Sequence, residues 1–256
     1  MAEYVRLDVD GRGIAWITLA RPDVRNAFDA QLVAELTETL AKLDLAARAV
    51  VLRAEGDAFC AGADLNWMRR IANHTLEENV ADARALAHMF RHLDELSMPL
   101  LARVQGPAIG GGAGLVAVCD IAIASTAASF AFTEVRLGIV PAVVSPYVVR
   151  KIGFAHATAL FTTGQRFDAQ RAREIGLVED VVSPEGLDER LATALEAILA
   201  AGPRAVNAAK RLVREIAGRH PSDVRDLTIE RIAAIRVSPE GQEGMHAFLE
   251  RRPPKW

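Results

Sequence analysis

The chain has 256 residues, of which 51% are hydrophobic and 25% charged, and its formal net charge is −3. This composition is typical of a globular protein with one large or two small domains. The net charge lacks the excess of basic residues that is typical of nucleic-acid-binding proteins. No uncharged apolar run approaches the roughly 20 residues of a membrane span, and the N-terminus, with Glu3, Arg6 and Asp8, does not read as a signal peptide.

The first part of the chain alternates predicted strands and helices. Gly13–Leu19 predicts a strand, and Asp29–Leu45 predicts a helix because its leucines recur at helical spacing behind Asp29, a good N-cap. Ala49–Arg53 predicts another strand. This order indicates a βαβ unit.

A long helix is predicted over Thr75–Leu96, with Leu76, Val80, Phe90 and Leu93 on one apolar side. Pro99 ends this helix. The elements predicted after it are the strand Leu100–Val104, the helix Gly112–Cys119, the strand Asp120–Ala124, the helix Ala169–Ile175 and the strand Leu177–Val182.

The pattern changes after Gly202, where three helices are predicted over Arg204–Ile216, Asp223–Val237 and Gly241–Arg251. We therefore expect an α/β body over residues 1–200 and a helical region over 201–256. Cys60 and Cys119 lie in apolar stretches, and we interpret them as buried free thiols of a cytoplasmic protein.

Residues 106–115 read Gly-Pro-Ala-Ile-Gly-Gly-Gly-Ala-Gly-Leu between two apolar runs. Three consecutive glycines are costly inside a strand or helix, and they fit a place where the backbone approaches something closely. A helix entered through glycines directs free N–H groups outward. Residues 57–65 form a second loop of this kind, and two such loops together favour binding of one developing oxyanion.

Three further patterns have alternative interpretations. Gly112-x-Gly114-x-x-Ala117 fits a permissive dinucleotide fingerprint, but a whole βαβ unit precedes it. His88 and His92 have metal-ligand spacing, but no HExxH pattern contains them, so no metal site is predicted. Glu134 is either a surface group paired with Arg136 or a proton-transfer acid in an apolar pocket.

Taken together, these segments resemble the crotonase superfamily, the enoyl-CoA hydratase/isomerase family, in family order along nearly the whole chain. The matching segments are Arg21–Phe28, Phe59–Leu65, Gly106–Asp120, Phe130–Pro141, Thr163–Arg166, Ala172–Val178 and Phe248–Trp256. The resemblance implies a crotonase-type spiral of ββα repeats. It also implies a C-terminal helical region that makes a trimer or a hexamer and caps the active site.

The resemblance further implies an acyl-CoA thioester as substrate, with coenzyme A as part of it and no separate cofactor. Its carbonyl oxygen is expected between the N–H groups of Ala63 and Gly111, with Glu134 as the catalytic acid. The other residues that match substrate-binding positions are Arg25, Ala61, Asp64, Leu65, Gly110, Gly114 and Pro141.

One departure bears on the reaction. Hydratases of the well-known type have two glutamates, and the first falls at Gly114, where we expect free space and one negative charge fewer. A hydratase is predicted, and Thr133–Val149 resembles bacterial methylglutaconyl-CoA hydratases, which also tend to lack that glutamate. A Δ3,Δ2-enoyl-CoA isomerase using Glu134 alone and a non-catalytic acyl-CoA- or RNA-binding relative remain alternatives.

Overall fold

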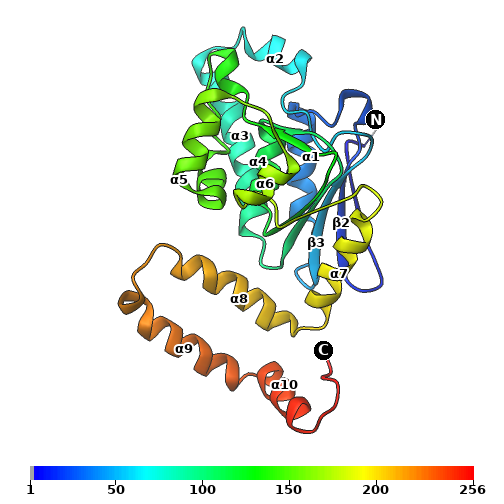
Figure 1. The fold of residues 1–256 in the computed structure, drawn as a ribbon, viewed down its shortest axis with the longest axis vertical. Coiled ribbons are helices and arrows are strands. Elements are labelled where there is room, and N and C mark those ends of the chain that lie inside the picture. The colour runs from blue at the N-terminus through cyan, green and yellow to red at the C-terminus, as the bar shows by residue number, and fades with distance from the viewer. Residues whose placement is uncertain (1–2) are drawn as a thin grey trace.

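The computed structural model describes residues 3–256, and its centre is a six-stranded sheet in the order β1-β2-β3-β4-β6-β9 (Figure 1). The β1–β2 pair is antiparallel and every other pair in this sheet is parallel. Its strands are β1 (Val5–Val9), β2 (Ile14–Leu19), β3 (Ala49–Ala54), β4 (Leu100–Val104), β6 (Ile121–Ser125) and β9 (Asp180–Val182).

A second sheet has three short strands in the order β5-β7-β8. The chain passes from β4 in the large sheet to β5 in the small one, then through a helix to β6 and on to β7. Each turn therefore adds one strand to each sheet, which produces the predicted spiral. The small-sheet strands are β5 (Ala108–Ile109), β7 (Ser129–Ala131) and β8 (Phe167–Asp168).

Ten α-helices are described. They are α1 (Ala30–Ala41), α2 (Leu65–Ile71), α3 (Leu76–Glu95), α4 (Gly111–Val118), α5 (Ser145–Thr163), α6 (Ala169–Glu174), α7 (Leu187–Leu199), α8 (Pro203–Ile216), α9 (Arg225–Arg236) and α10 (Pro239–Leu249). Helices α1, α3 and α4 pack on one face of the large sheet, α7 covers the other, and α8, α9 and α10 lie away from the sheet (Figure 1).

Both faces of the large sheet are buried, which is why its central strands read as apolar runs. Along β3, Val50 and Leu52 belong to the large core beneath α1, α3 and α4. Ala49 and Val51 point to the opposite face, where α7 covers them with a row of leucines, Leu187, Leu191 and Leu195.

The predicted helix starts are confirmed by their caps. The Asp29 carboxylate accepts a hydrogen bond from the N–H of Leu32 at 2.8 Å and begins α1. Thr75 and Glu78 form a reciprocal capping box at the start of α3. The predicted βαβ unit is also confirmed, because β2 and β3 pair in parallel around α1.

Several expectations need correction. The apolar side of α3 is buried only toward its end: Leu76 is 75% exposed, whereas Phe90 is fully buried. The helix after Asp29 ends at Ala41, four residues early, and the last sheet strand covers only Asp180–Val182. The elements that were not predicted include β1, α5, α7 and the three short strands of the small sheet.

Helices α8, α9 and α10 form an arm that extends from the body at the end opposite α2 (Figure 1). No residue of α8 or α9 is buried. The arm contacts the body through Lys210, whose ammonium lies 2.5 Å from the Asp120 carboxylate and donates to the Met98 carbonyl at 2.8 Å. Among the described residues, no helix is long and apolar enough to cross a membrane.

Candidate active site

A cavity in the body has a volume of about 680 Å³. Four structural segments line it: the loop at 61–65, the start of α4, the segment 133–144, and the facing sides of α2 and α3. Both glycine-containing loops and Glu134 therefore open into one space, as the sequence predicts.

The first loop is fixed by a parallel bridge between Phe28 and Ala63. The Phe28 N–H donates to the Gly62 carbonyl at 2.7 Å, and the Asp64 N–H donates to the Phe28 carbonyl at 2.7 Å. In this pattern the N–H of Ala63, between the two bonded residues, points away from Phe28. It meets no acceptor among the described residues, although Ala63 lines the cavity.

The second loop lies beside the first because Cys60 bridges to Ala108 of β5. The Ile109 N–H donates to the Cys60 carbonyl at 2.9 Å. A Cβ on Gly112 would lie 2.9 Å from the Cys60 Cβ and closer still to its carbonyl oxygen, so this approach requires glycine. α4 then begins at Gly111, whose N–H has no acceptor within residues 3–256 and whose backbone lines the cavity.

Glu134 is placed by the small sheet. β7 pairs in parallel with β5, and the Gly110 N–H donates to the Ala131 carbonyl at 2.8 Å. Three residues after β7, Glu134 opens a short 3₁₀ turn, Glu134–Leu137. Its Oε1 would lie only 2.9 Å from a Cβ on Gly110, so the carboxyl sits directly beside the start of α4.

The carboxyl of Glu134 is partly buried in apolar surroundings, and this burial raises its pKa above the ordinary value near 4.5. Its Oε2 is buried and has no hydrogen-bond partner in the described part of the chain. None of the ion pairs within residues 3–256 joins it to Arg136. Arg136 packs against Gly164 instead, so the surface-pair interpretation does not describe this group.

The thiol of Cys60 lies in the first loop but is not a nucleophile. It is fully buried, and burial raises its pKa to about 12. A thiol with so high a pKa stays protonated at neutral pH, and the thiolate is the reactive form.

Two residues that the sequence reading missed hold the first loop. Asn26 is fully buried, and its side-chain amide donates to the carbonyls of Glu55 at 2.8 Å and Ala58 at 2.9 Å. The guanidinium of Arg21 lies 3.4 Å from the carboxylate of Asp64 in this loop and 3.0 Å from that of Asp29. The signal was present, since both belong to the Arg-Pro-x-x-x-Asn segment, but their positioning role depends on contacts distant in sequence.

The other residues expected to bind substrate separate into two groups. Ala61, Leu65, Gly110 and Pro141 line the cavity. Arg25, Asp64 and Gly114 are not among the lining residues.

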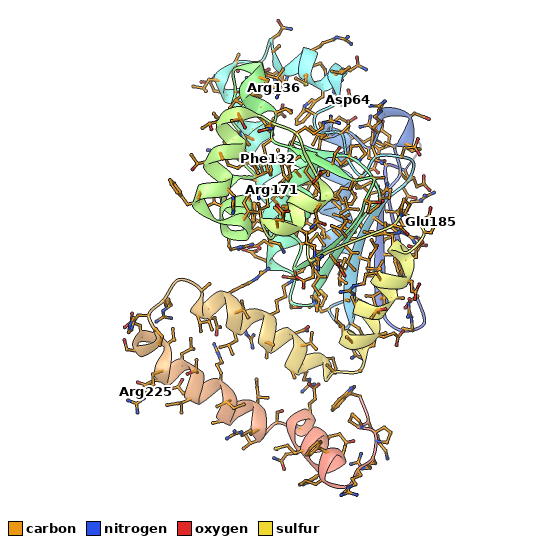
Figure 2. The ribbon with its side chains drawn as sticks, viewed as in Figure 1. Asp64, Phe132, Arg136, Arg171, Glu185 and Arg225 are labelled. Atoms are coloured by element: carbon orange, nitrogen blue, oxygen red, sulfur yellow. The ribbon has the colours of Figure 1, made fainter. Side chains whose placement is uncertain are left out.

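Arg25 and Asp64 have backbone and capping roles in this structure. The Arg25 carbonyl accepts from the Ala61 N–H at 2.9 Å, which ties Arg25 to the first loop from outside the cavity. Asp64 caps α2 through the N–H of Asn66 at 2.8 Å and lies 3.4 Å from the guanidinium of Arg21. Figure 2 shows Asp64 at the end of the body that carries α2, away from the arm.

The free space expected beside Gly114 is absent. A Cβ built on Gly114 would lie 2.8 Å from the Cβ of Val144, nearer still to its Cγ1, and 3.2 Å from Cζ of Phe90. Val144, itself a cavity-lining residue, fills the position. The missing glutamate is therefore replaced by an apolar wall and not by a hole.

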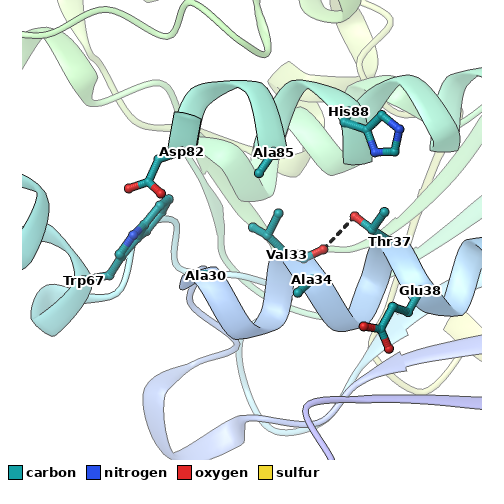
Figure 3. A pocket seen from close by; sticks show the side chains of 9 residues that line it. All are labelled: Ala30, Val33, Ala34, Thr37, Glu38, Trp67, Asp82, Ala85 and His88. Carbon is teal, nitrogen blue, oxygen red and sulfur yellow. Dashed lines mark hydrogen bonds between the residues drawn. The ribbon is translucent and has the colours of Figure 1, made fainter. Parts of the chain in front are cut away.

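A second, smaller cavity of about 300 Å³ lies between α1 and α3 (Figure 3). It shares Trp67 and Asp82 with the larger cavity but contains neither free N–H group nor Glu134. His88 lines it, and the centroid of its ring lies 4.0 Å from that of His92, with the two rings tilted by 51°. In the described part of the chain, no three His, Cys, Asp or Glu side chains gather as a metal site would require.

The fold and the site together define an enzyme of the acyl-CoA-handling crotonase type. The family model described as enoyl-CoA hydratase/isomerase matches residues 10–256. The crystal structure of an enoyl-CoA hydratase from Shewanella pealeana is 41% identical, with a TM-score of 0.94 over 99% of this chain and 96% of that one. The chain therefore belongs to the enoyl-CoA hydratase/isomerase family of the crotonase superfamily.

Two curated relatives have more specific names. The (E)-benzylidenesuccinyl-CoA hydratase of Thauera aromatica is 31% identical over 98% of this chain and 97% of its own length. The 2,3-dehydroadipyl-CoA hydratase of Escherichia coli is 32% identical over 93% of this chain and 92% of its own length.

Proposed function

We propose that this protein adds water to the α,β-double bond of an enoyl-CoA thioester. One observation carries the proposal: the unpartnered Oε2 of Glu134 and the free N–H groups of Ala63 and Gly111 border the same cavity. An enoyl thioester needs both parts. Two N–H donors stabilise the negative charge that develops on its carbonyl oxygen, and an acid–base group moves the proton.

In the proposed reaction the thioester oxygen accepts hydrogen bonds from Ala63 and Gly111, which withdraws electrons from C3. Glu134, ionised, takes a proton from water as the water oxygen bonds to C3. The electron pair of the double bond moves to the enolate, and Glu134 returns the proton to C2. One O–H bond breaks, and one C–O and one C–H bond form. The raised pKa of Glu134 suits a group that takes and returns a proton near neutral pH.

A second candidate, Δ3,Δ2-isomerisation, is supported by the single carboxyl group, that of Glu134, beside the two N–H donors. The described lining residues include two carboxyl groups, Glu134 and, on α3, Asp82. A single carboxyl beside the donors is sufficient to move a proton from C2 to C4. A panel of 2-enoyl and 3-enoyl thioesters followed by mass spectrometry separates the reactions: hydration adds the mass of water, and isomerisation leaves the mass unchanged.

We propose an acyl group with a second carboxylate, methylglutaconyl, as the preferred substrate. The absence of an acid at Gly114 removes one repulsion for such a group, and two relatives are named for acyl groups of this kind. Because the described lining includes no lysine or arginine, the carboxylate must turn toward α2, whose last turn bears Arg69 and Arg70.

This proposal predicts a kcat/KM for methylglutaconyl-CoA that is about tenfold higher than for crotonyl-CoA, the size of effect expected from one charge-assisted contact. Replacing Arg69 and Arg70 together by alanine should remove that preference and leave crotonyl-CoA turnover unchanged, whereas Arg84→Ala on α3 should leave both unchanged. Equal wild-type kcat/KM values for the two thioesters would contradict the proposed acyl group but not the proposed hydration reaction.

We further propose that residues 1–200 are the catalytic core and that residues 201–256 hold the chains together as a trimer or hexamer. The protein is proposed to work in the cytoplasm, with no cofactor besides the coenzyme A of its substrate. The arm supports this assembly because it exposes large apolar side chains, including Val213, Val237 and Phe248 at 65%, 76% and 82%. No arm residue lines the cavity, so capping requires the arm of another copy. Light scattering of the purified chain tests the assembly, and a monomer would contradict it.

A further inference from the structure

Val144 occupies the space that Gly114 leaves on α4. The two residues lie 30 positions apart in the chain, yet a Cβ on Gly114 would lie 2.8 Å from the Cβ of Val144 and nearer to its Cγ1. Val144 is 3% exposed, it lines the cavity, and its isopropyl group faces α4 at Gly114.

The position of Val144 is firmly held. Its carbonyl accepts from the N–H groups of Tyr147 and Val148, both at 3.1 Å, at the start of α5. The ring of Tyr147 stacks on that of Phe90 at 5.6 Å, and Phe90 is fully buried beside Gly114. The side chain of Val144 therefore moves only if α5 moves, or if its own volume or that of its neighbour at 114 changes.

Val144 also lies near the reacting carbons. Gly114 is three residues after the proposed donor Gly111 on α4, a rise of about 4.5 Å along the helix. C2 and C3 are one and two bonds from the thioester carbonyl carbon, so an acyl chain that runs from Gly111 along α4 passes Val144. The wall that Val144 builds therefore faces the part of the acyl group where substituents on the double bond project.

We propose that Val144, seated over Gly114, is the residue that determines whether an enoyl thioester with a substituent on C3 is accepted. This inference rests on the proposed function and deepens it. The two residues pack against each other. A smaller residue at 144 therefore enlarges the site toward α4, and a larger residue at 114 forces Val144 into the cavity.

The test compares crotonyl-CoA with 3-methylcrotonyl-CoA, two uncharged thioesters that differ by one methyl group on C3. Val144→Ala should raise the branched-to-straight ratio of kcat/KM by about tenfold or more, the usual effect of one methylene in an apolar pocket. Gly114→Ala should lower the ratio. The double variant should return toward the wild-type ratio, because alanine at 144 makes room for the added methyl group, and such coupling is expected for residues in contact.

Val143→Ala is the matched control, since Val143 lines the same cavity but is not among the atoms nearest to Gly114. It should change the ratio much less than Val144→Ala. Dissociation constants of the saturated analogues, butyryl-CoA and 3-methylbutyryl-CoA, give a second readout that needs no turnover. If Gly114→Ala does not fold, Val144→Ala and the double variant still test the proposal.

Two results would overturn the proposal: a ratio within twofold of wild type in Val144→Ala, or an equal change in Val143→Ala. Failure of the proposed function looks different. In that case the wild type hydrates neither thioester, while the binding ratio of the saturated analogues still shifts in Val144→Ala.

Discussion

The two sides of the cavity are built in opposite ways. One side, the donor wall (Ala63, Gly110, Gly111 and Glu134), is backbone fixed by bridges between loops, with a single carboxyl beside it. The other, the acyl wall, consists of side chains that stay largely open, with Leu65, Leu137, Ile139 and Val140 at 69%, 58%, 54% and 67% exposure. Chemistry that requires exact placement therefore lies on the rigid side, close to the firmly held Val144, and the open side offers side chains that can adapt to the rest of the acyl group.

Glu134→Gln should produce the largest effect on the donor wall. The amide keeps the size of the carboxyl but cannot take and return a proton, so kcat should fall by about 10²–10⁴-fold with acyl-CoA binding retained. Asp82→Asn on α3 is the matched control, since Asp82 lines the same cavity, and it should retain most of the activity. Turnover of the glutamine variant near the wild-type rate would remove Glu134 from the mechanism.

The two walls can be compared by one substitution near each, Gly112→Ala at the donor wall and Leu137→Ala in the acyl wall, with kcat as the measured quantity. The added methyl at 112 would push against the Cys60 carbonyl and separate the two donor loops. A displacement of about 1 Å in a reacting geometry costs on the order of 100-fold in rate. Leu137→Ala removes only an exposed side chain and should change kcat by less than about fivefold. Similar losses in both variants would show that the walls do not differ in this way.

Asn26→Ala tests whether the donor wall depends on remote polar contacts. The substitution leaves the Glu55 carbonyl and the Arg21 N–H without the partners that Asn26 supplies, whereas the Ala58 carbonyl keeps a hydrogen bond from the side-chain amide of Gln105 at 3.1 Å. We expect a loss of about 2–4 kcal/mol in the free energy of unfolding, from two or more unsatisfied groups, and a lower kcat at unchanged fold. Denaturant unfolding with steady-state kinetics measures both. A variant as stable as wild type would contradict the role assigned to Asn26.

The smallest predicted effect is on stability as a function of pH. Burial raises the pKa of Glu134 above 4.5 in the folded protein, so its ionisation opposes folding. The wild type should match Glu134→Gln in stability below about pH 4.5 and become less stable than the variant as pH rises through the raised pKa. Thermal unfolding across this range checks the sign, and a wild type that gains on the variant with rising pH would contradict it.

Much of this site was predictable because its chemistry is carried by short segments. The glycine loops and Glu134 indicate backbone donors and an acid, and the cap residues Asp29 and Thr75 mark true helix starts. The row of leucines in α7 recurs at helical spacing and is a readable sequence signal. Gly153 interrupts α5 with φ +78°, and that helix has no clear periodic signal.

The environment of Gly114 was not predictable from the sequence. A glycine in the sequence shows that a side chain is missing but not whether the space is empty, and here Val144 comes from 30 residues away to fill it. For the same reason the sequence did not separate Asp64, which caps α2 and pairs with Arg21, from residues that line the cavity. Such assignments depend on contacts between distant segments.

The most direct test of the account is the state of the thioester carbonyl in the bound substrate. Glu134→Gln, which should bind without turnover, allows the infrared stretch of a ¹³C-labelled enoyl-CoA carbonyl to be recorded in the site. Two hydrogen bonds from Ala63 and Gly111 predict a band at lower frequency than for the same thioester in water, and a thioether analogue without the carbonyl should bind more weakly. A band at the solution frequency, with equal affinity for thioester and thioether, would contradict the claim that the donor wall polarises the substrate.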